Sequence, residues 1–131
     1  MLVKFHAKSV VTEHPESEFF FVGFADDPVE TINYLLLQRA FEDEEQDIAL
    51  GHNTYHVELN DQANSGYGGL STFLLHRNHL ELSFASDILD QLDGIVGVLI
   101  TFELSDQQFE LLHEQLKLVF TGNNCFARVA T

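Results

Sequence analysis

The stretch EFFFVGF, residues Glu18 to Phe24, decides the fold class of this chain. Its dense apolar and aromatic residues predict a β-strand that is buried on both faces or nearly so. The acidic pair Asp26-Asp27 and then Pro28 follow directly and end the strand. The chain is therefore expected to be built around β-structure.

The segments on either side favour further strands. Residues Leu2–Val11 alternate weakly and predict a first strand, and Thr12–Ser17, which contains a proline and charges, predicts a turn. After the break, Ile32–Arg39 (INYLLLQR) fits a third strand or the start of a helix. Its apolar density and Tyr34 favour the strand, whereas its three consecutive leucines are equally compatible with a helix.

The clearest alternation lies in NTYHVELN, residues Asn53–Asn60. Successive side chains of a strand point to opposite faces, so one apolar and one polar face are expected. The glycine-rich SGYGG, Ser65–Gly69, predicts a turn or bulge because glycine permits positive φ. The apolar face carries Tyr55, Val57 and Leu59, and the polar face carries His56 and Glu58.

The second half of the chain predicts a hairpin and another strand. Leu74-Leu75 and Leu80–Phe84 flank the tetrapeptide HRNH, which places Arg77-Asn78 at the hairpin tip. Ile95–Leu104 is the next expected strand.

One long helix is expected near the end of the sequence, over Ser105–Phe120. Ser105 and Gln108 have the spacing of a capping box, and apolar residues recur at helical spacing. Gly122 is a suitable stop signal. Short helical turns are expected within Phe41–Gly51 and Ser86–Leu92, and Gly122–Thr131 is expected to be a tail in which Cys125-Phe126 packs back.

Together these elements predict a single domain over residues 1–131. The predicted fold class is α+β: a mostly antiparallel β-sheet of about six or seven strands with one C-terminal helix and short helical turns.

Charge is the strongest compositional signal. The 131 residues carry 21 acidic and 6 basic side chains, a formal net charge of −15. The resulting field repels nucleic acid and anionic membrane and favours association with basic surfaces, although a solubility charge explains it equally well. Neither nucleic acid nor a membrane is therefore expected as a partner. No apolar stretch reaches the roughly 18–20 residues of a spanning helix, and no secretory signal is expected.

Hydrophobic residues make up 45% of the chain, which is enough for a buried core. The lone Cys125 has no internal disulfide partner, which fits a cytoplasmic location, and it is expected to be a packing residue.

The first candidate site is the acidic segment FEDEEQD, which holds five carboxylates within six positions. Such a cluster serves either as a docking patch for Lys and Arg or as a solvated loop. A calcium site is disfavoured because the spacing of an EF-hand loop is absent. The carboxylates are those of Glu42, Asp43, Glu44, Glu45 and Asp47.

The histidines supply two further candidates. His56 and Glu58 share a strand face and form the smallest acid–base pair, but no nucleophile is tied to them. His76 and His79 flank the hairpin tip and can converge on one face, although no strong metal motif occurs. We therefore predict no catalytic residues, no cofactor and no metal. A small enzyme or a ligand- or metal-binding module, built on His56 and Glu58 or on the hairpin histidines, remains the alternative.

Several blocks taken together resemble a known family. YLLLQR (34–39), DEEQD (43–47), TYHVE (54–58) and SGYGG (65–69), preceded by VGFAD (22–26), resemble in order and spacing the bacterial immunity-protein family numbered ten, from polymorphic toxin systems. The resemblance is close over residues 20–70, and the terminal strand and helix agree in pattern only.

The resemblance implies a small, mainly β protein that is encoded beside a toxin and neutralises it by direct binding. The family residues carried over are those of the matching blocks: Gln38, Arg39, Asp43, Glu44, Glu45, Gln46, Asp47, Tyr55, His56, Glu58, Ser65, Tyr67 and Gly68. A basic toxin would suit the net charge, and self-association of the chain stays open. The predicted partner-binding residues are Glu42, Asp43, Glu44, Glu45, Asp47, Tyr55, His56, Glu58, Ser65 and Tyr67.

Overall fold

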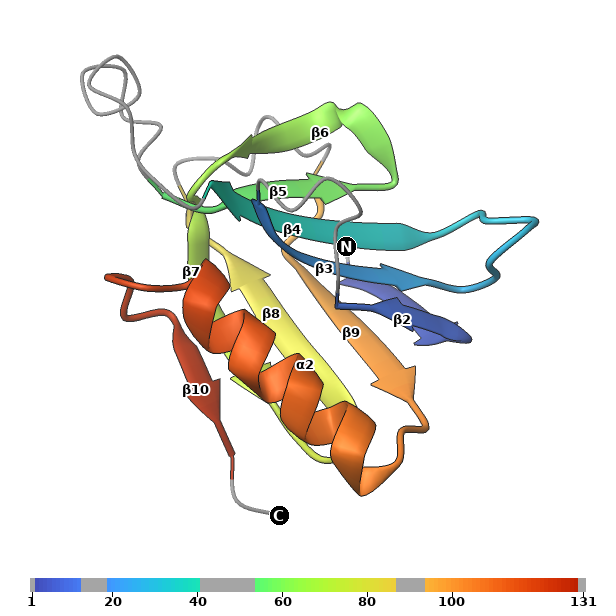
Figure 1. Ribbon diagram of the computed structural model, residues 1–131. Helices are drawn as coiled ribbons and strands as arrows, with labels where there is room; N and C mark the ends of the chain where they lie inside the picture. The colour runs from blue at the N-terminus through green and yellow to red at the C-terminus, as the bar shows by residue number, and fades with distance from the viewer. Residues whose placement is uncertain (1, 13–18, 41–53, 87–93, 130–131) are drawn as a thin grey trace.

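The computed structural model describes residues 2–12, 19–40, 54–86 and 94–129. Within these ranges the chain forms two five-stranded sheets and one long helix (Figure 1). The first sheet has the order β1-β9-β8-β7-β10, and the second has the order β2-β3-β4-β5-β6. The strands are β1 (Leu2–Ala7), β2 (Ser9–Val11), β3 (Phe19–Ala25), β4 (Tyr34–Ala40), β5 (His56–Leu59), β6 (Asp61–Tyr67), β7 (Leu70–Leu75), β8 (His79–Phe84), β9 (Gly97–Phe102) and β10 (Phe126–Arg128), and the helix is α2 (Asp106–Val119).

The chain passes between the two sheets at two places. Lys8 alone separates β1 from β2, and the pair Gly68-Gly69 separates β6 from β7. Both glycines have positive φ, 70° and 92°, which side-chain-bearing residues rarely adopt. These crossings make the two sheets one continuous structure. Most pairings are antiparallel, and β1 with β9 and β10 with β7 are parallel.

Helix α2 packs across β3 and β4 of the second sheet and beside β10 of the first (Figure 1). Its N-terminus has the predicted capping box, in which the Ser105 hydroxyl accepts from the Gln108 backbone N–H and the Gln108 side chain accepts from the Ser105 backbone N–H. Its buried face consists of Phe109, Leu112, Leu116 and Val119, as the helical spacing predicts.

Aromatic rings join the helix end to both sheets. The Phe120 ring, which follows α2, lies 4.8 Å from the Tyr55 ring and 5.1 Å from the Phe73 ring, measured between centroids. Tyr55 precedes β5 in the second sheet, and Phe73 lies on β7 in the first. The core therefore forms where residues from three distant parts of the sequence meet, and their burial is the main favourable term in folding.

The predicted fold class is confirmed: the protein is α+β and mostly antiparallel. The strand predicted over 18–24 is observed as β3, Phe19–Ala25, and Glu18 lies outside the described residues. Val22 and Phe24 face the core, and Phe21 is half-buried on the other side. The ambiguous INYLLLQR is strand β4, and the β7–β8 hairpin has the predicted tip.

Three details differ from the sequence-based expectation. Residues 2–11 form two strands, because the chain bends at Lys8 from one sheet to the other. The polar segment 61–67 is an edge strand, which the hydrophobic pattern does not reveal. The tail of residues 122–131 includes β10, whose three residues pair with the edge of β7. The structure therefore has more strands than the six or seven predicted.

The expected turn over residues 12–17 and the short helical turns over 41–51 and 86–92 lie mostly or wholly outside the described residues.

Candidate partner-binding face

The solvent-facing side of β4, β5 and β6 brings together most of the described candidate residues. His56 pairs with Gln38 of β4 on one side and with Tyr67 of β6 on the other. Glu58 pairs with Leu36 of β4 and with Ser65 of β6. We call this surface the β4–β6 face, and its residues are Leu36, Gln38, His56, Glu58, Ser65 and Tyr67.

The alternation predicted for NTYHVELN produces this face. Tyr55, Val57 and Leu59 are buried in the core, and His56 and Glu58 are half-buried on the opposite side. The strand thus places its apolar side chains inward and its polar ones outward, which confirms the two predicted faces.

Local contacts fix the polar side chains of the face. The Tyr34 hydroxyl donates a 2.7 Å hydrogen bond to Oε2 of Glu58. The His56 ring packs edge-on against the Tyr67 ring, with centroids 4.9 Å apart. In the candidate acid–base pair, Glu58 is therefore hydrogen-bonded to Tyr34, and His56 is packed against Tyr67.

A tight connection between β5 and β6 anchors the opposite end of the face. Asn60 has a φ of 62°, and its side-chain oxygen accepts a 2.8 Å hydrogen bond from the Tyr34 backbone N–H. The pairing of β5 with β6 shifts register between Glu58 and Leu59, as in a β-bulge. Asn tolerates positive φ better than most residues, which explains its presence here.

Tyr55 differs from the other candidates because it is only 2% exposed. Its hydroxyl accepts a 2.9 Å hydrogen bond from the Leu70 backbone N–H, and its backbone oxygen accepts one from Gly68 N–H. Burial raises the pKa of Tyr55 to about 12. These contacts hold the crossing between β6 and β7, so Tyr55 supports the fold from within the core.

The acidic carboxylates Glu42, Asp43, Glu44, Glu45 and Asp47 lie outside the described residues. The described residues nearest to it on either side are Ala40, which ends β4, and Thr54, which lies shortly before β5. Ala40 follows the paired Gln38 by two residues, and Thr54 precedes the paired His56 by two residues.

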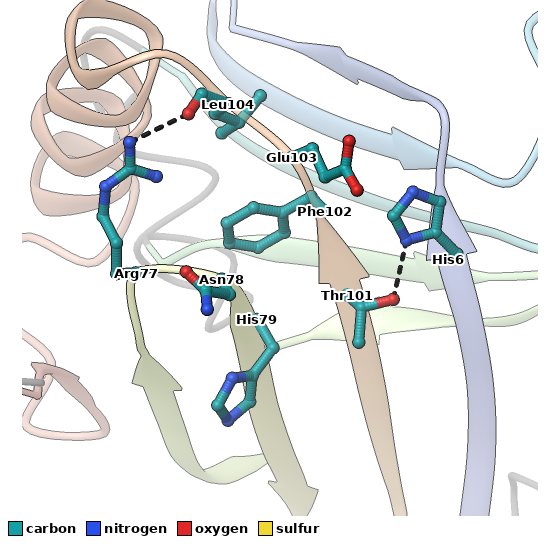
Figure 2. Close-up of a pocket in the computed structure, with 8 residues that line it drawn as sticks. All are labelled: His6, Arg77, Asn78, His79, Thr101, Phe102, Glu103 and Leu104. Atoms are coloured by element: carbon teal, nitrogen blue, oxygen red, sulfur yellow. Dashed lines mark hydrogen bonds between the residues drawn. The ribbon is translucent and has the colours of Figure 1, made fainter.

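Among the described residues, hollows on the first sheet include two that are lined by neither His56 nor Glu58. The larger, of about 700 Å³, is open to solvent and lies near the hairpin tip (Figure 2). Its polar residues make structural contacts: His6 Nδ1 lies 2.8 Å from Thr101 Oγ1, and Arg77 donates to the Leu104 carbonyl and the Asp106 carboxylate, each at 2.8 Å. Figure 2 shows the His79 ring directed away from the His6–Thr101 pair.

The hairpin histidines converge as the sequence analysis anticipated. The His76 and His79 rings stack with centroids 4.2 Å apart and an angle of 9° between their planes. Glu81, which is not among the residues predicted from the sequence, lies beside them. The sequence carried a signal for Glu81, because residues two apart on one strand, such as His79 and Glu81, point to the same face.

Sequence reasoning also missed an ordered turn between β3 and β4. The Asp26 carboxylate accepts from the backbone N–H groups of Ile32 and Asn33, and the Asp27 carboxylate accepts from those of Val29 and Glu30. These bonds lower the pKa of both carboxyl groups. They also hold Val29 and Ile32 in solvent, 87% and 78% exposed. The Asp-Asp-Pro sequence, typical of side-chain-capped turns, was the available signal.

The fold and this face define a small α+β protein that presents a mixed aromatic and polar sheet surface to solvent. The chain belongs to the Immunity protein 10 family, whose family model matches residues 6–110. The match extends well beyond residues 20–70, which carry the resemblance seen in the sequence. Membership of an immunity-protein family indicates toxin neutralisation in general. No curated protein and no solved structure shows a significant similarity to the chain. Among the described residues, no helix has the length and apolar character needed to cross a membrane.

Proposed function

We propose that this protein neutralises a cognate basic toxin by direct binding, using the β4–β6 face together with the acidic segment that follows β4 in the sequence. The observation that carries the proposal is the cross-strand row of Gln38, His56 and Tyr67, which lies near the end of β4 and the start of β5, the two strands that flank the acidic segment in the sequence. A row of this kind gives a partner a continuous surface drawn from three strands.

The composition of the face suits protein recognition. Tyr67 is 48% exposed, and its ring is backed by His56. Tyrosine is enriched among residues that dominate binding energy, because it combines apolar area with a polar tip. Tyr67 is therefore the proposed anchor, and His56, Glu58 and Ser65 supply polar contacts around it.

Charge supports the same assignment. With a formal net charge of −15, the protein attracts a basic partner over distances comparable to the Debye length, about 8 Å at physiological ionic strength. The acidic segment concentrates five of the 21 carboxylates within six positions. Complementary charge accelerates encounter and fixes orientation, so this segment would steer the toxin onto the β4–β6 face.

The test uses the purified chain and the toxin encoded beside its gene. We expect a stoichiometric complex whose association rate falls steeply with salt, and loss of toxin activity at one equivalent. Inhibition at far below one equivalent would indicate catalysis by this chain instead. Absence of a complex at any salt concentration, with a toxin shown to be folded and active, would overturn the proposal.

A charge-matched pair of variants locates the steering surface. One variant carries Asp43→Asn, Glu44→Gln and Glu45→Gln, and the control carries Glu30→Gln, Glu103→Gln and Glu114→Gln. Each removes three carboxylates, so the formal net charge rises from −15 to −12 in both. The first should slow association and flatten its salt dependence more than the control does. Equal effects would show that overall charge, and not the acidic segment, steers the partner.

A further inference from the structure

The outer face of the first sheet carries a three-residue cluster at the β7–β8 hairpin. The His76 backbone N–H donates a 2.8 Å hydrogen bond to the His79 carbonyl, which closes the hairpin and places the two histidines opposite each other. Glu81 follows His79 by two residues on β8, so its side chain leaves the same face of the strand. We call these three residues the hairpin cluster.

The side-chain atoms of the hairpin cluster converge. His76 Nε2 lies 4.0 Å from Glu81 Oε2, and His79 Nε2 lies 3.7 Å from Glu81 Oε1. One potential ligand atom from each residue lies within 4.8 Å of those of the other two. Two imidazole nitrogens therefore face one carboxylate.

His76 supplies a second, independent observation. Its Nε2 atom is buried and has no hydrogen-bond partner among the residues that the structure describes. A buried polar atom without a partner is uncommon in folded proteins and points to a water or ion that completes its bonding. This nitrogen belongs to the hairpin cluster and lies toward the Glu81 carboxylate.

We propose that the hairpin cluster binds a divalent transition-metal ion of the zinc class, with His76, His79 and Glu81 as its three protein ligands. Two imidazoles and one carboxylate are a donor set that Zn²⁺ uses, whereas Mg²⁺ and Ca²⁺ prefer oxygen ligands alone. Three protein ligands leave a fourth tetrahedral position for water or for a group of another molecule. The β-hairpin holds two of the ligands in register through its own backbone hydrogen bond.

Binding requires a limited adjustment. Bonds of about 2.0–2.2 Å in a tetrahedral site place the ligand atoms about 3.4 Å apart, so the cluster must contract. The two rings must also rotate out of their stacked arrangement, because a metal ion lies in the plane of each imidazole that binds it. Glu81 has room to move, since its side chain is 53% exposed.

The first experiment is calorimetric titration of the metal-free full-length chain with ZnCl₂ in a non-chelating buffer. We expect one zinc ion per chain. His79→Gln and Glu81→Gln should each weaken binding at least about tenfold, since even supporting residues around a metal contribute that much. His6→Gln is the matched control: it removes a histidine from the same face, where His6 contacts Thr101, and leaves the hairpin cluster intact. Its zinc affinity should equal that of the unmodified chain.

Two further measurements keep the result decisive. Thermal unfolding without metal establishes that each variant is folded, and titration with MgCl₂ separates zinc-class binding from general attraction to acidic groups. Zinc-induced NMR shifts should concentrate on the His76 and His79 rings. Three results would overturn the proposal. The unmodified chain binds no zinc, both cluster variants bind zinc as tightly as the unmodified chain, or Mg²⁺ binds as strongly as zinc. The result is independent of toxin neutralisation.

Discussion

The Tyr34 hydroxyl on β4 donates a hydrogen bond of 2.7 Å to the Glu58 carboxylate on β5. Tyr34 also lies where Asn60 closes the β5–β6 connection, since its backbone N–H donates to the Asn60 side chain. The Glu58 side chain on the polar side of β5 is thus held in place by Tyr34 of the neighbouring strand β4. Glu58 therefore has a defined geometry in the unbound protein, and in the proposed toxin complex such preorganisation would reduce the entropy lost on binding.

Replacing Tyr34 with Phe should lower the free energy of unfolding by about 0.5–1.5 kcal/mol, the usual net contribution of a hydrogen bond. The ring is retained, so packing changes little. Urea denaturation followed by circular dichroism measures the difference. An unchanged free energy of unfolding would show that a hydrogen bond from water to Glu58 stabilises the protein as much as the one from Tyr34.

Alkaline pH should destabilise the protein through two tyrosines. Burial, followed by the hydrogen bond to Glu58, raises the pKa of Tyr34 from 10.0 to about 12, and burial raises the pKa of Tyr55 from 10.0 to about 12. A raised folded-state pKa favours the neutral form, so this stability is fully present below pH 10 and is lost as pH rises from 10 toward 12. Unfolding free energies measured across this range should fall, and Tyr34→Phe should reduce the fall. A flat profile would contradict the assignment.

Tyr67→Ala should weaken the proposed toxin complex by about 2 kcal/mol, or roughly 30-fold in Kd, if Tyr67 is the anchor of the β4–β6 face. Leu111→Ala is the control, because Leu111 is similarly exposed (53% against 48%) but lies on α2. Surface plasmon resonance at constant salt gives both affinities. Equal losses, or none for Tyr67→Ala, would remove Tyr67 from the interface.

The capping box of α2 should contribute about 1 kcal/mol, the typical value for a capping serine replaced by alanine. Ser105→Ala removes the acceptor for the Gln108 backbone N–H, whereas Ser105→Asp keeps an acceptor and adds favourable charge at the helix N-terminus. We expect destabilisation from the first change and near-native stability from the second. Guanidinium denaturation compares them, and equal losses would show that the hydroxyl itself is needed elsewhere.

Gly97→Ala should disrupt the first sheet. A Cβ at this position would lie 2.6 Å from the Leu82 carbonyl oxygen of the neighbouring strand, so β8 or β9 must shift. Overpacking of this kind typically destabilises by about 1–3 kcal/mol. Gly66→Ala is the control, because no atom lies within 4 Å of its Cβ position. Similar melting temperatures for the two variants would contradict the close approach at Gly97.

Local patterns predicted much of the fold. The period of two in NTYHVELN correctly divided the buried residues from His56 and Glu58, and the Ser105–Gln108 spacing correctly marked the start of α2. The same strand pattern could not reveal that Tyr55, although grouped with the binding residues, holds the crossing between sheets. That role depends on Leu70, which belongs to another strand.

The sequence by itself determined the strand alternation, the helix cap and the hairpin, because each depends on residues within a few positions of one another. It also determined the acidic charge and the family. Tertiary structure alone decided that β1 and β2 belong to different sheets and that β10 pairs with β7. It likewise decided that His56 and Tyr67 share a face and that Glu81 completes the hairpin cluster. These relationships arise when strands pair and the chain bends between sheets, and such long-range contacts leave no periodic signal in any single segment.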